Sequence, residues 1–157
     1  MFNLFKRKNT NDADKVRVEY IQAVVTPYGE AQLRVAENRR GKSLTDAERN
    51  TAEILVVGAI DYVAATVQAH EEKFVAAVIA NIFPDLFGYT GDEAIRRISP
   101  LLNSYNHKDT LAIMQIGGDS VRDFLKAVET EDNHALTAAS ETLANILNSG
   151  VTFSLST

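Results

Sequence analysis

The segment from Thr45 to Val67 constrains the fold more than any other part of the chain. Thr45 is followed three residues later by Glu48, and this Thr-x-x-Glu spacing is the capping box that begins a helix. The helix that follows carries apolar residues on almost every side, which is typical of a helix buried at the centre of a protein. We therefore expect the remaining segments to pack around it.

Most other apolar residues also recur at helical spacing. A first helix is expected from about residue 12, with an apolar stripe formed on or near Val16, Tyr20, Ile21, Val24 and Val25. Pro27 then either kinks this helix or begins a second segment, because proline is tolerated best in the first turn of a helix. The basic residues and glycine at 39–42 are expected to end that segment.

Caps, prolines and glycines predict the later boundaries. A second capping box, Thr90-x-x-Glu93, begins a helix that Pro100 is expected to interrupt. Residues 111–116 form a short helix or a buried strand, which Gly117 and Gly118 are expected to end. One last helix is predicted across residues 136–147.

The C-terminal residues alternate between apolar and small polar side chains, which predicts an extended tail laid along the body. Together the segments predict an all-α, single-domain fold: an irregular bundle of about seven or eight helical segments with a short extended C-terminal tail. Residues 1–11 form an N-terminal lead-in, and residues 12–157 form the helical domain. A chain of 157 residues with 45% apolar content can form one sizeable core.

The composition narrows the chemistry that the chain can perform. It has no cysteine, which excludes disulfides, thiolate nucleophiles and cysteine-based metal sites. A Glu-x-x-His motif occurs once, at Glu131 and His134, without the second copy that a metal site in a helical bundle uses. We therefore expect no metal and no cofactor.

The chain is predicted to be soluble and cytoplasmic. Its longest apolar-rich run, residues 54–67, is shorter than the roughly 20 residues of a membrane span and contains Asp61. The opening residues MFNLFKRK lack the pattern of a secretory signal. Their mixture of apolar and basic side chains suggests a helix start that docks on the body, a frayed terminus, or a weak contact of residues 1–8 with a membrane surface.

Charge is distributed unevenly along the chain. The net charge is −5, but residues 1–44 carry a balance of +4 and residues 45–157 a balance of −9. The acidic body argues against nucleic-acid binding, which needs a positive surface. It favours a basic protein partner, or it serves solubility alone.

Residues 83–94, FPDLFGYTGDEA, are the strongest candidate for a partner-binding site. Phe83 continues the stripe of the preceding helix and is assigned to the core. The remaining aromatic and acidic side chains would suit a basic protein surface. The predicted partner-binding residues are Asp85, Phe87, Tyr89, Asp92 and Glu93, and the alternative is that the aromatic rings pack inward.

Asp61 is a second candidate, because it lies within the apolar central helix. A buried carboxyl group must be paired or hydrogen-bonded, or else it stays protonated. Such a group can contact a ligand or act as an acid with a raised pKa. It can equally bond a tyrosine, an arginine or a backbone group in the core.

The sequence contains no catalytic constellation, which favours a protein without catalysis of its own. The leading hypothesis is a helical protein–protein interaction protein that binds a basic partner, such as an immunity or antitoxin-type inhibitor or an adaptor. The alternative is a small-molecule-binding protein or an enzyme with a pocket among the helices near Asp61. The oligomeric state is not indicated by the sequence.

Overall fold

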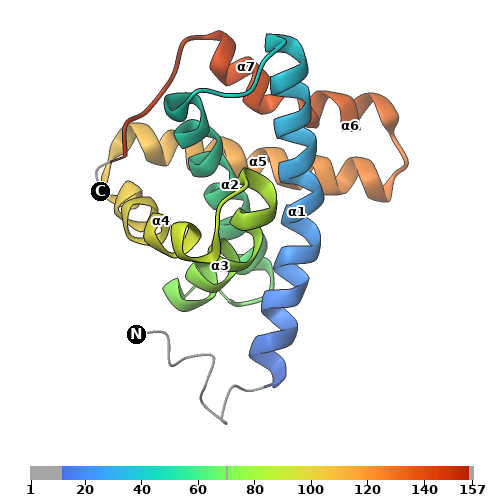
Figure 1. Ribbon diagram of the computed structural model, residues 1–157. Coiled ribbons are helices and arrows are strands. Elements are labelled where there is room, and N and C mark those ends of the chain that lie inside the picture. Colours follow the sequence, from blue (N-terminus) through green and yellow to red (C-terminus); the bar gives the residue numbers. More distant parts are fainter. Residues whose placement is uncertain (1–11, 70, 156–157) are drawn as a thin grey trace.

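The computed structural model describes residues 12–69 and 71–155, and within these residues the regular structure is helical (Figure 1). The all-α prediction is therefore confirmed, whereas the predicted lead-in of residues 1–11 lies outside the described residues. The elements are α1 (Asp12–Arg40), α2 (Asp46–Thr66), α3 (Glu72–Phe87), α4 (Gly91–Asn103), a 3₁₀ turn (Ser104–Asn106), α5 (Lys108–Glu129), α6 (Asn133–Ser140) and α7 (Thr142–Asn148).

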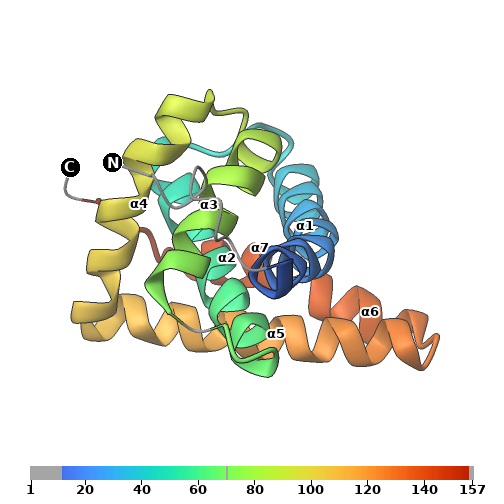
Figure 2. The ribbon, with the colours of Figure 1, turned by 90° about the horizontal axis from the view of Figure 1, so that it is seen from below.

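Helix α2 lies at the centre of the molecule, as predicted, with the other helices arranged around it (Figures 1 and 2). Its capping box forms in full: the Thr45 hydroxyl accepts from the Glu48 amide at 3.2 Å, and the Glu48 carboxylate accepts from the Thr45 amide at 3.1 Å. Every residue from 51 to 60 is buried. The capping box therefore sets where the central helix begins, and its apolar faces are covered by its neighbours.

Helix α5 crosses α2 in the most extensive helix–helix contact of the described structure. Two glycines allow the backbones to touch there. A Cβ atom on Gly58 of α2 would lie 2.5 Å from the Cα of Met114 and closer still to its carbonyl oxygen, and a Cβ on Gly117 of α5 would collide with the Leu55 carbonyl. The prediction that Gly117 and Gly118 end a helix was wrong, since α5 runs through both glycines and uses them for close packing.

Helix α1 is one continuous helix through Pro27, so the proline does not begin a new segment. A proline inside a helix removes a single backbone hydrogen bond, and buried residues on both sides, Val25 and Tyr28, hold this part of α1 against the core. The predicted apolar stripe is buried only in part. Val16 and Tyr20 are 62% and 46% exposed, since the first turns of α1 lie at the edge of the molecule (Figure 1).

Helix α4 also continues through its proline, and the prediction that Pro100 interrupts it was wrong. Pro100 lies in the last turn of α4, where the missing amide costs one hydrogen bond, and its ring is buried. The capping box at the start of α4 is confirmed. The Thr90 hydroxyl accepts from the Glu93 amide at 3.2 Å, and the Glu93 carboxylate accepts from the Thr90 amide at 2.7 Å.

The predicted last helix is two helices, α6 and α7, and a side chain from α1 causes the break. In a continuous helix the Leu143 amide would donate to the Ala139 carbonyl. Instead, the fully buried amide of Gln32 takes both places: its Nε2 donates to the Ala139 carbonyl at 2.6 Å, and its Oε1 accepts from the Leu143 amide at 2.9 Å. A side chain inserted into the helical ladder in this way bends the chain.

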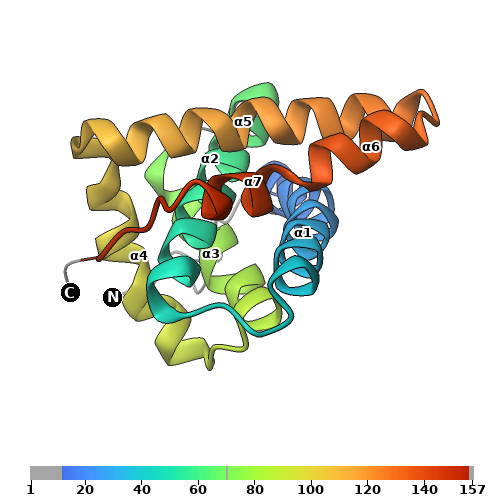
Figure 3. The same ribbon diagram turned by 90° about the horizontal axis from the view of Figure 1, so that it is seen from above.

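The C-terminal residues 151–155 form the predicted extended tail. Val151, Phe153 and Leu155 are half-buried against the core, and Asn50 of α2 donates from its side chain to the Phe153 carbonyl at 2.8 Å. On the other side of the molecule, the end of α5 and α6 form a helical hairpin that projects beyond α1 (Figures 2 and 3). The helix α4 lies at the edge of the molecule opposite α1 (Figures 2 and 3).

Candidate binding pocket between α2 and α4

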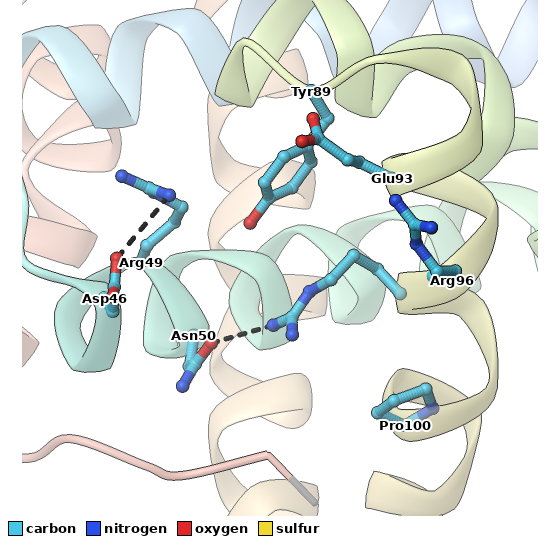
Figure 4. Close-up of a pocket in the computed structure, with 8 residues that line it drawn as sticks. Asp46, Arg49, Asn50, Tyr89, Glu93, Arg96 and Pro100 are labelled. Carbon is cyan, nitrogen blue, oxygen red and sulfur yellow. Dashed lines mark hydrogen bonds and ion pairs between the residues drawn. The ribbon is translucent and has the colours of Figure 1, made fainter. Parts of the chain in front are cut away.

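An open pocket with a volume of about 440 Å³ lies between the first turns of α2 and helix α4 (Figure 4). This volume is within the range of roughly 300–1,000 Å³ that small-molecule sites occupy. Figure 4 shows the side chains of α2 on one wall, those of α4 on the other and Tyr89 between the two helices. The lining residues are Asp46, Arg49, Asn50, Tyr89, Glu93, Arg96, Arg97 and Pro100.

A buried ion pair joins the two helices beneath this pocket. The carboxylate of Glu53 on α2 has no solvent exposure, and the guanidinium of Arg97 on α4 binds both of its oxygens, with Nε at 3.1 Å from Oε1 and Nη2 in a short contact with Oε2. Burial alone would lower the pKa of Arg97, but the hydrogen bonds and the charge of Glu53 raise it. Arg97 therefore stays charged, and the two side chains hold each other in place.

Tyr89 reaches the same carboxylate from the short linker between α3 and α4. Helix α3 ends at Gly88, whose φ of 70° is a left-handed conformation that glycine adopts without strain. This turn directs Tyr89 inward, where its hydroxyl donates to Glu53 Oε1 at 2.7 Å. Burial first, and then the hydrogen bond and charge of Glu53, raise the pKa of Tyr89 to about 12. The phenol is therefore a neutral donor near pH 7.

Asn50 completes the network and links it to the tail. Its side-chain oxygen accepts from Arg97 Nη2 at 2.7 Å, while its Nδ2 donates to the Phe153 carbonyl. Three described hydrogen bonds thus use the Nε and Nη2 atoms of Arg97, and none of them uses Nη1. The side chain of Arg97 is 19% exposed at the pocket. The floor of the pocket is therefore a fixed guanidinium with donors to spare.

Two further arginines stand on the walls. Arg49 lies 3.7 Å from the fully exposed carboxylate of Asp46 and has its guanidinium 5.9 Å from the centre of the Tyr89 ring. Arg96 is exposed and forms no ion pair with any residue that the structure describes. Exposed pairs such as Asp46–Arg49 contribute about 0–1 kcal/mol, so Asp46 holds Arg49 only weakly, and the second contact of Arg49 is with Tyr89.

The predicted partner-binding residues do not all meet at this pocket. Tyr89 and Glu93 line it, although the Tyr89 hydroxyl is held by Glu53 and the Glu93 carboxylate caps α4. Phe87 is half-buried and packs on Phe83 with ring centres 4.8 Å apart, so this ring points inward. Asp85 and Asp92 are exposed outside the pocket lining, and their contact with a basic partner stays a prediction.

Asp61 is half-buried on α2 and does not line the pocket. It interacts with Tyr105 of the 3₁₀ turn: burial, and next the charge and hydrogen bond of Asp61, raise the pKa of that tyrosine. The sequence left two roles open for Asp61, a ligand contact or a bond to another residue of the protein such as a tyrosine, and the interaction with Tyr105 corresponds to the second. The predicted ligand pocket beside it stays a prediction.

The carboxylate beneath the pocket is well occupied. Glu53 accepts three hydrogen bonds, from the Tyr89 hydroxyl and from Nε and Nη2 of Arg97. Among residues 12–69 and 71–155, no group of three or more His, Asp or Glu side chains is arranged to hold a metal ion. The pocket presents the guanidinium of Arg97, which Glu53 and Asn50 hold in place, to a ligand that enters.

Sequence reasoning missed the residues on which the pocket depends, Glu53, Asn50 and Arg97. Glu53 and Arg97 lie 44 positions apart, so no local spacing connects them. One signal was present: Glu53 directly precedes the apolar run of the central helix, and Asp61 lies within that run. A charge in a helix predicted to be buried on every side requires a partner from another element.

No helix in the described part of the chain combines the length and the apolar character that crossing a membrane requires. Comparisons with protein-family models, with curated proteins and with solved structures each found no match to this chain.

Proposed function

We propose that this chain is a non-catalytic binding protein, an inhibitor or adaptor, whose binding site is the pocket between α2 and α4. The observation that carries the proposal is the buried Glu53–Arg97 pair at the floor of an open pocket. A buried ion pair is weak as a source of stability, because desolvation costs about as much as the attraction gains. Such a pair is better explained where a charged group has to be held rigidly at a binding surface.

The walls support the same proposal. Arg49, Arg96 and Tyr89 belong to the residue types that dominate binding energy in protein interfaces. They surround a pocket large enough for one or two side chains of a partner. The basic partner expected from the net charge would meet the exposed acids outside the pocket, whereas the pocket itself offers the hydrogen-bond donors of three arginines.

The test is affinity capture from the native cells with three forms of the chain: the unchanged protein, Arg96→Glu and the control Arg34→Glu. Arg34 is exposed on α1, a helix that contributes no residue to the pocket lining, and it forms no ion pair in the described structure. Both substitutions change the net charge equally. Any difference between them therefore reports on the pocket and not on charge.

We expect one stoichiometric partner to be retained by the unchanged protein and by Arg34→Glu, and to be lost by Arg96→Glu. Circular dichroism should show the same helical content in all three forms. Equal retention of the partner by both variants would remove the pocket from the binding site. Turnover of a substrate by the purified chain would contradict the non-catalytic part of the proposal.

A further inference from the structure

We propose that the pocket between α2 and α4 receives an oxyanion, a carboxylate or phosphoryl group, which Arg97 binds from the floor and Arg49 and Arg96 bind from the walls. This inference rests on the proposed binding function and names the chemistry of what enters the site. Three of the residues that line the pocket are arginines. Carboxylate and phosphoryl groups are the groups that a guanidinium recognises best.

The hydrogen-bond inventory of Arg97 supports the floor of this site. A guanidinium has five N–H donors. The Nε donor and the two Nη2 donors are used by Glu53 and Asn50. The two Nη1 donors remain, on a side chain that borders the pocket. Each of them can donate to an oxygen of an oxyanion that enters the pocket.

Arg97 is held in advance of binding. Glu53 is fully buried, is bonded by both Arg97 and Tyr89, and cannot move without breaking these contacts. Asn50 fixes the other edge of the guanidinium. A donor that is already immobilised loses little conformational entropy on binding, which is the main cost of ordering a long side chain. The charge of Glu53 is offset by Arg97, so it does not repel an anion at full strength.

The lining carries three arginines against two acids, Asp46 and Glu93. Glu93 is engaged with the Thr90 amide at the start of α4. Asp46 is exposed to solvent beside Arg49, where the pairing is weak and easily exchanged. An anion in this pocket can accept hydrogen bonds from the guanidinium groups, whereas a cation cannot. The set of donors therefore favours an anion.

The size of the pocket indicates that the anion is part of a larger group. A volume of about 440 Å³ exceeds what a single phosphate or carboxylate fills, and Tyr89 and Pro100 supply apolar surface on the lining. An acidic or phosphorylated side chain of a protein partner combines an oxyanion with the apolar stem that this surface would cover.

The experiment is an NMR titration of the isotope-labelled chain with two probes, inorganic phosphate and succinate, each against sodium chloride at matched ionic strength. We expect saturable shifts in the resonances of Asn50, Tyr89 and Arg97 with at least one probe. In the double variant Arg49→Gln/Arg96→Gln the affinity should fall by about tenfold or more. The control Arg34→Gln should leave it unchanged. The probe that binds more tightly distinguishes a phosphoryl group from a carboxylate.

The opposite results overturn the inference. Pocket resonances that do not shift with either probe, or shifts that the double variant leaves unchanged, would show that no oxyanion is held here. If Arg96→Glu abolishes partner capture while neither probe shifts the pocket resonances, the proposed function stands and the inference of an oxyanion site is refuted. If the probes bind and partner capture ignores the pocket, the anion site stands and the proposed function fails.

Discussion

The substitution Gly58→Ala adds one methyl group at the point where α2 and α5 touch. The new Cβ would lie 2.5 Å from Met114 Cα and 2.6 Å from its carbonyl carbon, whereas carbon atoms in contact lie about 3.5–4.0 Å apart. The helices would therefore have to separate by about 1 Å. Because the obstacle is backbone, no rotation of a side chain can relieve it.

The expected cost follows from that separation. A gap of about 0.5–1 Å already forfeits a quarter to a half of the dispersion attraction of the atoms that face it, and α2 and α5 form the most extensive helix contact. Adding a methyl group to a packed core costs about 1–3 kcal/mol, occasionally more. Alanine recovers about 1 kcal/mol of helix propensity. We expect a net loss of about 2 kcal/mol in the free energy of unfolding, or about 4–8 °C in Tm for a chain of this size.

The assay is urea and thermal denaturation followed by circular dichroism, with Gly91→Ala as the matched control. Gly91 is the first residue of α4, and a Cβ there would meet nothing within 4 Å. We expect that variant to be as stable as the unchanged protein or more stable by about 0.5–1 kcal/mol. Gly117→Ala should resemble Gly58→Ala. If Gly58→Ala unfolds at the same urea concentration as Gly91→Ala, the backbone contact between α2 and α5 does not exist in solution.

Three further substitutions test other contacts by the same denaturation assay. Arg97→Met should cost about 3–5 kcal/mol, because it leaves the buried Glu53 charge unpaired; a cost below about 1 kcal/mol would show that this pair is not buried. Gln32→Leu should cost about 1–3 kcal/mol, since the Leu143 amide loses its buried partner while the Ala139 carbonyl keeps only the Ser120 and Thr142 hydroxyls, and an unchanged stability would contradict that bridge. Glu48→Gln should destabilise the protein near pH 7 more than the exposed capping-box variant Glu93→Gln. Burial alone would raise the pKa of Glu48, but the hydrogen bonds from Thr45 and the charge of Arg40, 2.5 Å away, lower it. A carboxyl group whose pKa is lowered on folding stabilises the fold above its unfolded pKa of about 4.3, and this stabilisation is lost as the pH falls through the pKa of the folded state. The excess cost of Glu48→Gln over Glu93→Gln should therefore shrink in acid. An excess that stays constant with pH would refute this explanation.

Local signals in the sequence predicted the features that depend on a few neighbouring residues. The two capping boxes, Thr45–Glu48 and Thr90–Glu93, start α2 and α4 where they were expected. The apolar character of the segment after Thr45 predicted the central position of α2. The alternation after Gly150 predicted the extended tail. Each of these depends on interactions within about one or two turns of chain.

Features that depend on distant partners could not be predicted in this way. Gly117 resembles a helix stop until α2 is placed against it, and then it is the residue that lets two backbones meet. The break at residue 141 is caused by Gln32, more than a hundred positions earlier. The pocket also depends on distant partners, since the ion pair at its floor joins Glu53 to Arg97, 44 positions apart in the sequence. The position of Glu53 in the central helix indicates that its charge needs a partner, but nothing local in the sequence identifies Arg97 as that partner.

The most direct measurement of the central claim is the capture of the partner in the presence and absence of inorganic phosphate and of succinate, with sodium chloride at matched ionic strength as the reference. If the partner is held through an oxyanion in the pocket between α2 and α4, at least one of the two probes should release it while the sodium chloride reference does not. Release that is equal in all three solutions would show that the partner is held by general charge attraction or at another surface, and would contradict the pocket as the binding site.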